Sequence, residues 1–411
     1  MPEFLSLVSP EAALSLLFSH LTLNLRDEDS KTEHALGKVT AEDILSPQNL
    51  PEFRRSTVDG YALIARDSHG ASESLPAYLK LAGEVLMGNS PDFDLSGKEC
   101  ALIHTGGMLP DSANAVVMLE DTQVLDAKEV EIFRSVASGE NVIEIGEDVT
   151  EGGIVIAKGT RLRPAEIGGL LALGITKIRT ILPPRIGIIS SGDEVIPPDQ
   201  NPKPGEVRDI NSYTLGALIN ELGAEVNHYG IIPDDRDDLK EILQIGLQEC
   251  DHIIVTAGSS ASSRDLTADV MNDLGNPGVL VHGVSIKPGK PTIFALAGEK
   301  VMIGLPGNPV SALVIAYILV KPIIQAYLGL ENRKTPASVP AKLKMNVPSQ
   351  AGREDWIPVR LIEGEKGIFQ AEPIFGRSNL IFLLAKADGL VKIPSSTTGL
   401  EAGMEVSVRL F

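Results

Sequence analysis

The sequence contains few cysteines, and this scarcity excludes two classes of small scaffold. Cys100 and Cys250 are its two cysteines, and they show no pairing pattern. A disulfide framework and a zinc knuckle both need more cysteines at close, regular spacings. We therefore expect each cysteine to be a small buried hydrophobic residue.

The chain also lacks a long uninterrupted apolar run. A membrane-spanning helix needs about 18 or more consecutive apolar residues, and the longest candidate, VSALVIAYILVKPIIQAYLG, is interrupted by Lys321 and Pro322. The N-terminus has no basic segment ahead of its apolar residues, as a secretory signal would. It indicates instead an amphipathic helix after the cap residue Ser9, with Pro10 at the first helical position. The sequence predicts a soluble, cytoplasmic protein without a targeting segment.

Basic residues are in the minority. The 36 lysines and arginines stand against 55 aspartates and glutamates, which gives a formal net charge of -19. An acidic surface repels nucleic-acid phosphates and anionic lipid headgroups, so we expect no nucleic-acid partner and no membrane partner. The simplest interpretation of the excess of acidic residues is that it keeps the protein soluble. A phosphorylated ligand would need a local pocket of backbone amides and a few cations.

The histidines and the single tryptophan indicate neither a metal site nor a cofactor contact. Trp356 is expected to lie in a core. The following histidines have no metal-ligand spacing and are interpreted as packing residues: His69, His104, His228, His252 and His282.

A chain of 411 residues predicts about two to four folding units. Residues 1–50 and 141–180 have mainly helical or extended patterns and flank residues 51–140, whose short apolar runs and turns indicate a β-rich unit. We therefore predict that this β-rich unit is inserted into a discontinuous N-terminal unit. Residues 333–411 return to a β pattern and predict a small C-terminal β-barrel or sandwich.

Residues 181–332 alternate strand, loop and helix. The strand candidates are RIGIIS, AEVNHYGII, DHIIVTA and KVMIGL. This alternation predicts a central three-layer α/β unit with a mostly parallel sheet, within an α/β multidomain chain. Ligands of such sheets bind beyond the carboxyl ends of the strands. The loops expected there, SSGDE, IPDD, TAGSSASSRD and LPGNPVS, are all rich in Gly, Ser, Asp or Asn, so we predict a ligand site among them.

Two turns that contain glycine and proline suit an anionic ligand. In GLPGNPVS, Gly307 permits a tight turn, Asn308 can cap a helix and Pro309 suits its first position, where backbone amides bind anions. In SIKPGKP, Lys287 and Lys290 bracket a Pro-Gly turn that holds two ammonium groups near one another. The alternatives are an ordinary strand-to-helix turn for the first segment and a solvated turn for the second.

Carboxylates also stand near the expected strand ends. Ser190, Ser191 and Gly192 can donate hydrogen bonds, and Asp193 and Glu194 follow them. Further candidates are Asp148, Asp234 and Asp265. Carboxylates gathered around phosphate oxygens are how proteins hold Mg²⁺. The alternatives are that Asp234 caps its helix and that the other acids are surface residues.

The β-rich unit contains two further segments of interest, STVDGYAL and IHTGGMLPDSANAVVMLE. Asp59-Gly60 and Gly106-Gly107 are turn dipeptides, and Thr105 places a hydroxyl beside glycine amides. By pattern alone both segments are interpreted as hairpin turns.

Together these segments resemble the MoeA and gephyrin E-domain family of molybdopterin molybdotransferases. The matching strings are STVDGYAL, HTGGMLP with ANAVVMLED, GEDV, SSGDEV, DINSYTL, IKPGKPT and GLPGNPVSA, in the family's order from about residue 50 to 315. The strings GREDWIPVR and ADGLVKIP extend the resemblance to the C-terminal unit. One such string would be weak, but seven in order are highly specific.

The resemblance implies a transferase that converts adenylylated molybdopterin and molybdate into molybdenum cofactor and AMP, with Mg²⁺. It implies an L-shaped homodimer of four-domain subunits, whose active-site cleft also uses the β-rich unit of the partner subunit. The α/β unit, which resembles the molybdopterin adenylyltransferase fold, would hold the pterin. Candidate protein partners are a molybdopterin adenylyltransferase and an apo-molybdoenzyme that receives the product.

The resemblance also assigns roles to individual residues. Molybdate would be bound by Lys287, Lys290, Ser311, Arg353 and Ser378. Mg²⁺ and the pyrophosphate would be handled by Glu194 and Asp265. Further acids and a hydroxyl of the cleft would be Asp59, Thr105, Asp148 and Asp234. The pterin or phosphate site would include Ser191, Gly192, Gly258, Ser259, Ser260, Pro306, Gly307 and Asn308.

Four positions depart from the family pattern. Ala257 and Ser262 stand in the TAGSSASSRD loop where glycines are usual, and replacing a glycine at positive φ costs about 1 kcal/mol or more. Gly283 stands where some members carry a basic residue, and Arg55 replaces a common Asn. These departures leave open a tungstate-preferring insertase, an adenylyltransferase and a non-catalytic molybdopterin-binding or scaffold protein.

Overall fold

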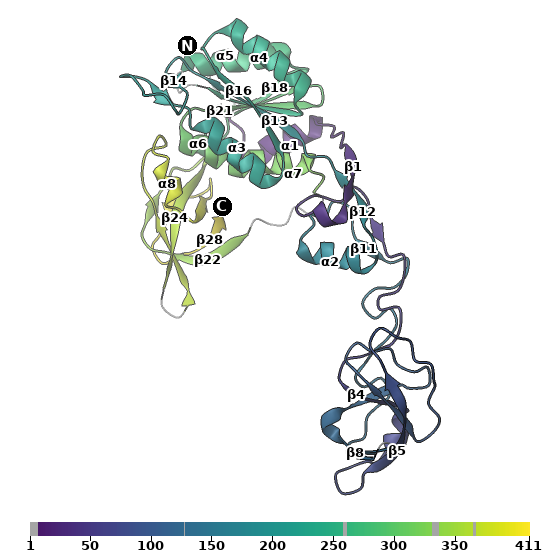
Figure 1. Cartoon of the computed structure of the whole chain (residues 1–411). Coiled ribbons are helices and arrows are strands. Elements are labelled where there is room, and N and C mark those ends of the chain that lie inside the picture. Colours follow the sequence, from purple (N-terminus) through teal and green to yellow (C-terminus); the bar gives the residue numbers. More distant parts are fainter. Residues whose placement is uncertain (1–6, 127, 258–260, 331–336, 365–366) are drawn as a thin grey trace.

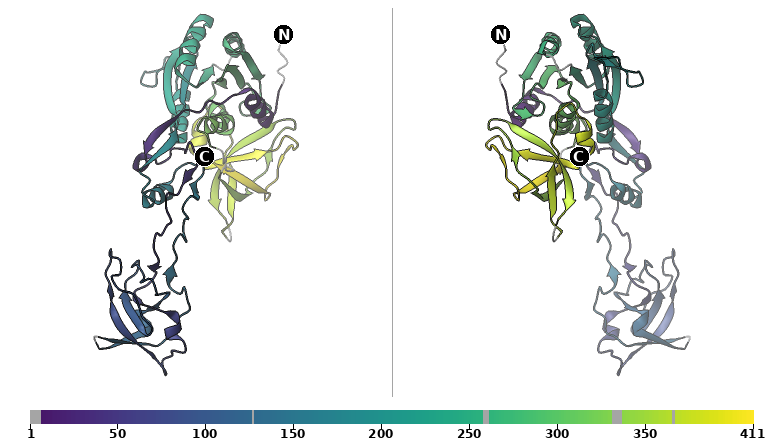
Figure 2. Two further views of the ribbon diagram at one scale, coloured as in Figure 1. Left: turned by 90° about the vertical axis from the view of Figure 1, so that its right-hand side faces the viewer. Right: turned by 90° about the vertical axis from the view of Figure 1, so that its left-hand side faces the viewer.

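The computed structural model describes residues 7–126, 128–257, 261–330, 337–364 and 367–411. The molecule is elongated (Figure 1). The α/β unit and the C-terminal barrel lie side by side at one end, and the β-rich unit lies at the other end of a two-stranded stalk. The views in Figure 2 show the same separation. This arrangement confirms the predicted α/β multidomain fold.

The α/β unit is built on a six-stranded sheet with the order β16-β13-β17-β21-β20-β18. Its four parallel strands are β13 (Arg185–Ser191), β16 (Glu225–Ile232), β17 (His252–Ala257) and β21 (Lys300–Pro306). At one edge β20 (Ile293–Ala297) runs antiparallel to β21, and β18 (Pro277–His282) pairs antiparallel with β20. The central strands are buried along almost their whole length because helices cover both faces. The predicted mostly parallel sheet is confirmed.

Helices form the two outer layers of the α/β unit. On one face lie α4 (Arg236–Glu249) and α5 (Ala261–Leu274). On the other face lie α3 (Asn211–Leu222), α6 (Pro309–Ile315) and α7 (Lys321–Tyr327). Neighbouring strand residues alternate between these layers, as Ile254 does with Val255.

Helix α1 (Pro10–His20) also packs on the α/β unit, although residues 1–50 are predicted as part of the N-terminal unit. Ala13 and Leu17 are fully buried in the α/β core, and Val8 forms a bridge with Val284. The apolar stripe of α1 is therefore covered by β18 and β20 rather than by the stretch at 141–180. Ser9 caps the helix as predicted, because its hydroxyl accepts from the backbone N–H of Ala12 at 3.1 Å.

One helical run, Pro309–Tyr327, is long and apolar enough to cross a membrane, but 72% of its apolar window is buried inside the protein. It consists of α6, a π-helical turn η4 (Ala316–Val320) and α7. Pro322 lacks a backbone N–H, and the wider π turn before it lets the helix continue. The run is accordingly a core helix of the α/β unit.

Two separate stretches build the N-terminal unit and the stalk. β1 (Asp27–Lys31) pairs with β12 (Lys177–Ile181), and the stalk contains β2 (Ile44–Leu45) with β11 (Ile154–Ile156) and β3 (Arg55–Ser56) with β10 (Val142–Ile143). Ala35 shares a small core with Leu170 of α2 (Pro164–Ala172). A short 3-10 helix, η1 (Thr32–His34), lies beside them. These contacts support the predicted insertion, whose exact boundaries stay a prediction.

The β-rich unit contains a six-stranded mixed sheet with the order β7-β4-β6-β5-β9-β8. Its strands are β4 (Gly60–Leu63), β5 (Ala77–Val85), β6 (Glu99–Ile103), β7 (Ala115–Met118), β8 (Thr122–Asp126) and β9 (Glu129–Ile132). Two 3-10 helices, η2 (Ala65–Ser68) and η3 (Leu119–Asp121), complete it. Separate apolar clusters fill the two sides of the sheet, so the unit has a core of its own.

The C-terminal unit is a closed five-stranded barrel, as predicted. The order is β24-β25-β22-β28-β26, and β26 pairs back with β24. Its strands are β22 (Ser338–Leu343), β24 (Glu354–Glu363), β25 (Phe369–Pro373), β26 (Gly389–Ile393) and β28 (Glu405–Leu410). Shorter elements are β23 (Val347–Pro348), β27 (Gly399–Leu400) and α8 (Phe382–Ala385). A strand of the α/β unit, β19 (Ile286–Lys287), adds to the barrel through β24.

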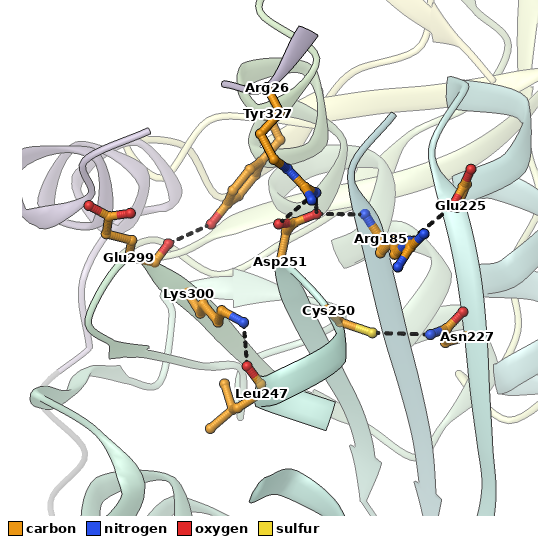
Figure 3. Close-up of polar contacts among 10 residues, drawn as sticks. All are labelled: Arg26, Arg185, Glu225, Asn227, Leu247, Cys250, Asp251, Glu299, Lys300 and Tyr327. Carbon is orange, nitrogen blue, oxygen red and sulfur yellow. Dashed lines mark hydrogen bonds and ion pairs between the residues drawn. The ribbon is translucent and has the colours of Figure 1, made fainter. Parts of the chain in front are cut away.

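Asp251 anchors the amino-terminal edge of the parallel strands (Figure 3). Its carboxylate accepts from the Arg26 guanidinium at 3.0 Å and from the backbone N–H of Arg185 at 2.8 Å. Arg185 also pairs with Glu225 of β16 at 3.3 Å. Burial raises the pKa of the neighbouring Cys250 thiol, in agreement with its predicted packing role. This edge is structural, and the strands run from it toward the site described below.

His252, at the start of β17, is fully buried, and neither of its ring nitrogens has a hydrogen-bond partner among the described residues. Burial lowers the pKa of His252 from 6.5 to about 3. Below pH 6.5 the unfolded chain therefore takes up a proton that the folded chain does not, so acidification from pH 6.5 toward pH 3 weakens folding.

We expect the free energy of unfolding to fall between pH 7 and pH 5 by about 2 kcal/mol more in the wild-type protein than in His252→Leu. Urea unfolding at the two pH values measures this difference. His69→Gln, which changes an exposed histidine of the β-rich unit, is the control and should keep the wild-type pH dependence. An unchanged pH dependence in His252→Leu would contradict a neutral buried imidazole.

Candidate functional site

A cavity of about 980 Å³ lies between the α/β unit and the C-terminal barrel, and we call it the cation cleft. It brings together six residues predicted from the sequence: Lys287, Lys290, Asn308, Ser311, Arg353 and Ser378. Arg377 adds a further cation to its lining. Cationic and hydroxyl side chains converging on one cavity are suited to binding a compact oxyanion.

The turn that carries the two lysines is packed tightly against α6. Gly289 has φ +108°, and a Cβ built on it would lie 2.2 Å from Cγ1 of Ile315. Only glycine fits this conformation and this close approach. The backbone of the lysine turn therefore packs directly against α6, while the side chains of Lys287 and Lys290 remain exposed.

A buried carboxylate that the sequence analysis did not single out links two of these cations. Asp355 is completely buried, and its Oδ1 accepts from Nε of Arg353 at 2.9 Å. Its Oδ2 lies 3.7 Å from Nζ of Lys287. The string GREDWIPVR contains the signal, because Arg353 and Asp355 are two residues apart on an extended chain and share a face.

The start of α6 forms another wall of the cation cleft. Asn308 occupies the N-cap position, but its side chain makes no capping hydrogen bond, contrary to the predicted cap. The backbone N–H of Val310 donates instead to the carbonyl of Ser378 at 3.0 Å, which joins the barrel segment to this helix. Ser311 is buried in the first turn of the helix. Asn308 thus lines the cavity without capping the helix through its side chain.

A second cavity of about 440 Å³ lies at the carboxyl ends of β13 and β17, and we call it the strand-end pocket. The predicted residues that line it are Ser191, Glu194, Gly307 and Asn308. Asn308 and Asn379 line both cavities, so the strand-end pocket and the cation cleft lie next to each other. Pro306 ends β21 directly before this junction.

Serines and carboxylates are hydrogen-bonded to one another at the strand-end pocket. Ser191 donates to Asp234 at 2.6 Å, and Ser190 donates to the buried carboxylate of Asp209 at 2.7 Å. Asp235, and not Asp234, caps α4, since its carboxylate accepts from the backbone N–H groups of Asp237 and Asp238. The alternative that Asp234 caps its helix is therefore wrong. Asp209 was not predicted, although its position directly before Ile210 and Asn211 places it at a helix start.

The two acids assigned to Mg²⁺ occupy different elements. Glu194 lines the strand-end pocket beside Gly192, and Asp265 is exposed in the second turn of α5. Among the described residues, no three His, Cys, Asp or Glu side chains gather into a metal site. The predicted Gly258, Ser259 and Ser260, between β17 and α5, lie outside the described residues.

The β-rich unit presents a compact polar cluster. Asp59 accepts from the backbone N–H of Thr105 at 2.7 Å and from the Thr105 hydroxyl at 3.1 Å, and these hydrogen bonds lower the pKa of Asp59. His104 lies beside them, with Nε2 3.0 Å from Glu84 and Nδ1 3.9 Å from Asp59. The interpretation of His104 as a packing residue is wrong, because its side chain is 41% exposed and joins this cluster.

The polar cluster does not reach the cation cleft of its own chain. Both views in Figure 2 and the view in Figure 1 place the β-rich unit at the far end of the stalk. Asp148 is exposed on the stalk, where its backbone N–H donates to the carbonyl of Leu50 at 3.0 Å. Within one chain, Asp59, Thr105 and Asp148 are therefore separate from the other predicted site residues.

Comparisons with known proteins agree over the whole chain. Residues 8–174 match the MoeA N-terminal region (domain I and II), residues 187–326 a probable molybdopterin binding domain, and residues 340–411 the MoeA C-terminal region (domain IV). A putative molybdopterin biosynthesis protein of Methanocaldococcus jannaschii is 36% identical, with 98% of each chain covered. The chain belongs to the MoeA family.

Other members of the MoeA family support the same assignment. The molybdopterin molybdenumtransferase of Haemophilus influenzae is 30% identical, with 98% of each chain covered. A crystal structure of a molybdopterin biosynthesis MoeA protein from Pyrococcus horikoshii is 38% identical, with a TM-score of 0.80 over 98% of this chain and 99% of that chain. A second such structure is 32% identical, with a TM-score of 0.86 over 99% and 100%.

Three departures from the family pattern can be located in the structure. Gly283 has φ 107°, so a glycine is favoured there over a basic residue. The guanidinium of Arg55 lies 4.7 Å from the ring centre of Phe53 on the stalk. Ala257 is buried at the end of β17 and lines the strand-end pocket. The side chain of Ser262 lies outside the described residues.

Proposed function

We propose that this protein is a molybdenum insertase, which transfers molybdenum from molybdate to adenylylated molybdopterin and releases AMP. The observation that carries the proposal is the convergence of Lys287, Lys290 and Arg353 on one cavity that adjoins a second cavity. Membership of the MoeA family, with relatives named molybdopterin molybdenumtransferase, supports the same reaction.

The two cavities divide the substrates by charge. Molybdate is a tetrahedral dianion, so the cation cleft neutralises it with ammonium and guanidinium groups and orients it with the hydroxyls of Ser311 and Ser378. The strand-end pocket holds the pterin and phosphate groups with Ser191 and the backbone of Gly307. Gly192 and Pro306 adjoin these two residues in the chain. A substrate that spans both cavities carries its dithiolene sulfurs to the oxyanion, which is a proximity effect.

Mg²⁺ fits the acids available at the strand-end pocket. Mg²⁺ is usually held by one or two carboxylates together with substrate phosphates, rather than by a complete protein cage. Glu194 lines the strand-end pocket, whereas Asp265 lies on α5 outside its lining, and we propose that these two acids hold the ion together with the substrate phosphates. Bound there, Mg²⁺ would neutralise charge on the pyrophosphate oxygens.

We propose that a second copy of the chain completes the site. Asp59 and Thr105 lie far from the cation cleft of their own chain, so another chain must bring them there if they take part. Helix α2 offers a contact face of exposed, uncharged residues: Pro164, Ala165, Gly168, Leu171 and Ala172. Such a face suits an isologous contact between copies. Asp148 on the stalk and Asp234 would then lie at the two sides of one composite cleft.

We propose that this activity takes place in the cytoplasm and that two protein partners act before and after it in the reaction sequence. A molybdopterin adenylyltransferase would supply the adenylylated substrate, and an apo-molybdoenzyme would receive the product. The acidic surface, with a net charge of -19, is unsuited to nucleic acid or anionic membranes.

Release of AMP from adenylylated molybdopterin, with Mg²⁺ and with or without molybdate, tests the proposed function. We expect release that depends on molybdate. Binding of the pterin without release would indicate a scaffold protein, and release that responds to tungstate but not to molybdate would indicate a tungstate insertase. ATP-dependent adenylylation of free molybdopterin would indicate an adenylyltransferase.

A further inference from the structure

We propose that Asp355 is a positioning residue of the oxyanion site, which holds Lys287 and Arg353 in the arrangement that binds molybdate. The inference deepens the proposed function and rests on it. Asp355 is completely buried and does not line the cation cleft itself, so it acts through the two cations and not on the anion.

The backbone fixes the Asp355 carboxylate relative to both cations. β19 and β24 pair in parallel, and their register places Lys287 directly opposite Asp355. The backbone N–H of Glu354 donates to the carbonyl of Ser285 at 2.9 Å, which holds this register. The pairing therefore joins β19 of the α/β unit to β24 of the barrel next to Lys287 and Arg353.

The two oxygens of Asp355 are divided between the cations. Oδ1 accepts from Nε of Arg353 at 2.9 Å, and Oδ2, which has no hydrogen-bond partner among the described residues, lies 3.7 Å from Nζ of Lys287. A buried carboxylate oxygen without a hydrogen bond is costly, so it favours Lys287 conformers that bring the ammonium close.

Positioning matters because lysine and arginine are long and flexible. Each side chain loses rotamer freedom when it binds an anion, and mutual repulsion separates cations that share a cavity. The side chains of Lys287 and Arg353 remain 57% and 32% exposed, so Asp355 restrains them without covering them. The restraint is in place before molybdate arrives, which reduces the entropy lost on binding.

Glu354 provides a matched control on the same strand. It is also a buried carboxylate, but it accepts from Nζ of Lys392 at 2.6 Å and lines neither cavity. Neighbouring residues of a strand point to opposite sides, so Glu354 faces away from the two cations. Glu354→Gln therefore removes a buried carboxylate from β24 without touching the oxyanion site.

Titration calorimetry of the full-length protein with sodium molybdate tests the inference. We expect Asp355→Asn to weaken molybdate binding by about tenfold or more, and Glu354→Gln to leave it unchanged. In a Lys287→Ala background the effect of Asp355→Asn should shrink several-fold, because one of the two groups it positions is gone. Thermal unfolding of each variant shows whether it is folded.

Four results would overturn the inference while leaving the proposed function intact. Unchanged molybdate binding in Asp355→Asn would show that the carboxylate does not position the cations. Tighter binding would show that its main effect is electrostatic repulsion of the anion. Effects of Asp355→Asn and Lys287→Ala that simply multiply would show that Asp355 acts independently of Lys287. Equal weakening by Glu354→Gln would indicate a general structural role. If the wild-type protein binds no molybdate, the proposed function itself fails, and this inference fails with it.

Discussion

Replacing Lys290 by alanine is expected to lower molybdate-dependent AMP release by about 10²–10³-fold, the usual effect of removing one preorganised group that stabilises an oxyanion. Lys290 lines the cation cleft on the same rigid turn as Lys287. In the described part of the chain its ammonium forms no ion pair with a carboxylate, so its charge is available to an anion in the cavity. Steady-state assays at several molybdate concentrations measure the effect.

Lys344→Ala is the matched control for this substitution. Lys344 pairs with Glu372 at 2.5 Å on the barrel surface and lines neither cavity. It should retain wild-type activity. If Lys290→Ala were as active as Lys344→Ala at limiting molybdate, the assignment of the cation cleft to molybdate would be untenable.

Two inactive variants are expected to complement one another. Asp59→Ala damages the β-rich unit, and Lys290→Ala damages the cation cleft. If each cleft is completed by the β-rich unit of a second copy, a dimer of one Asp59→Ala chain and one Lys290→Ala chain contains one intact site and one doubly damaged site. We expect such heterodimers to show about half of the wild-type activity, although each homodimer is nearly inactive.

Co-expression with two different affinity tags and sequential purification isolates these heterodimers. The control is a heterodimer in which one chain carries both substitutions and the other is wild type. In that dimer each site has one damaged component, so it should be nearly inactive. The opposite pattern, with activity only when both substitutions lie in one chain, would show that each chain builds its site alone.

The sequence predicts well those features that depend on local pattern. The strands of the α/β unit are apolar and β-branched, and the loops at their carboxyl ends carry the small and polar residues that now line the strand-end pocket. Lys287 and Lys290 could be recognised as a pair because the Pro-Gly turn between them is local. Their convergence with Arg353 followed from the family resemblance, since no local pattern connects these positions.

Features that depend on long-range pairing could not be predicted in the same way. The role of Asp355 depends on the register between β19 and β24, which belong to different units of the protein. Asp234 and Asp235 are chemically equivalent in sequence, and only the path of the chain decides which one caps α4 and which one accepts from Ser191. The packing of α1 on the α/β unit could likewise not be predicted, because an apolar stripe does not specify which surface covers it.

Formation of active cofactor shows whether this protein inserts molybdenum. The purified protein, adenylylated molybdopterin, Mg²⁺ and molybdate are incubated with an apo-molybdoenzyme, and the enzyme activity gained is compared with the AMP released. We expect both products to appear together, to require molybdate and to be lost in Lys290→Ala. AMP release without any gain of molybdoenzyme activity, or a gain that does not need this protein, would contradict this expectation.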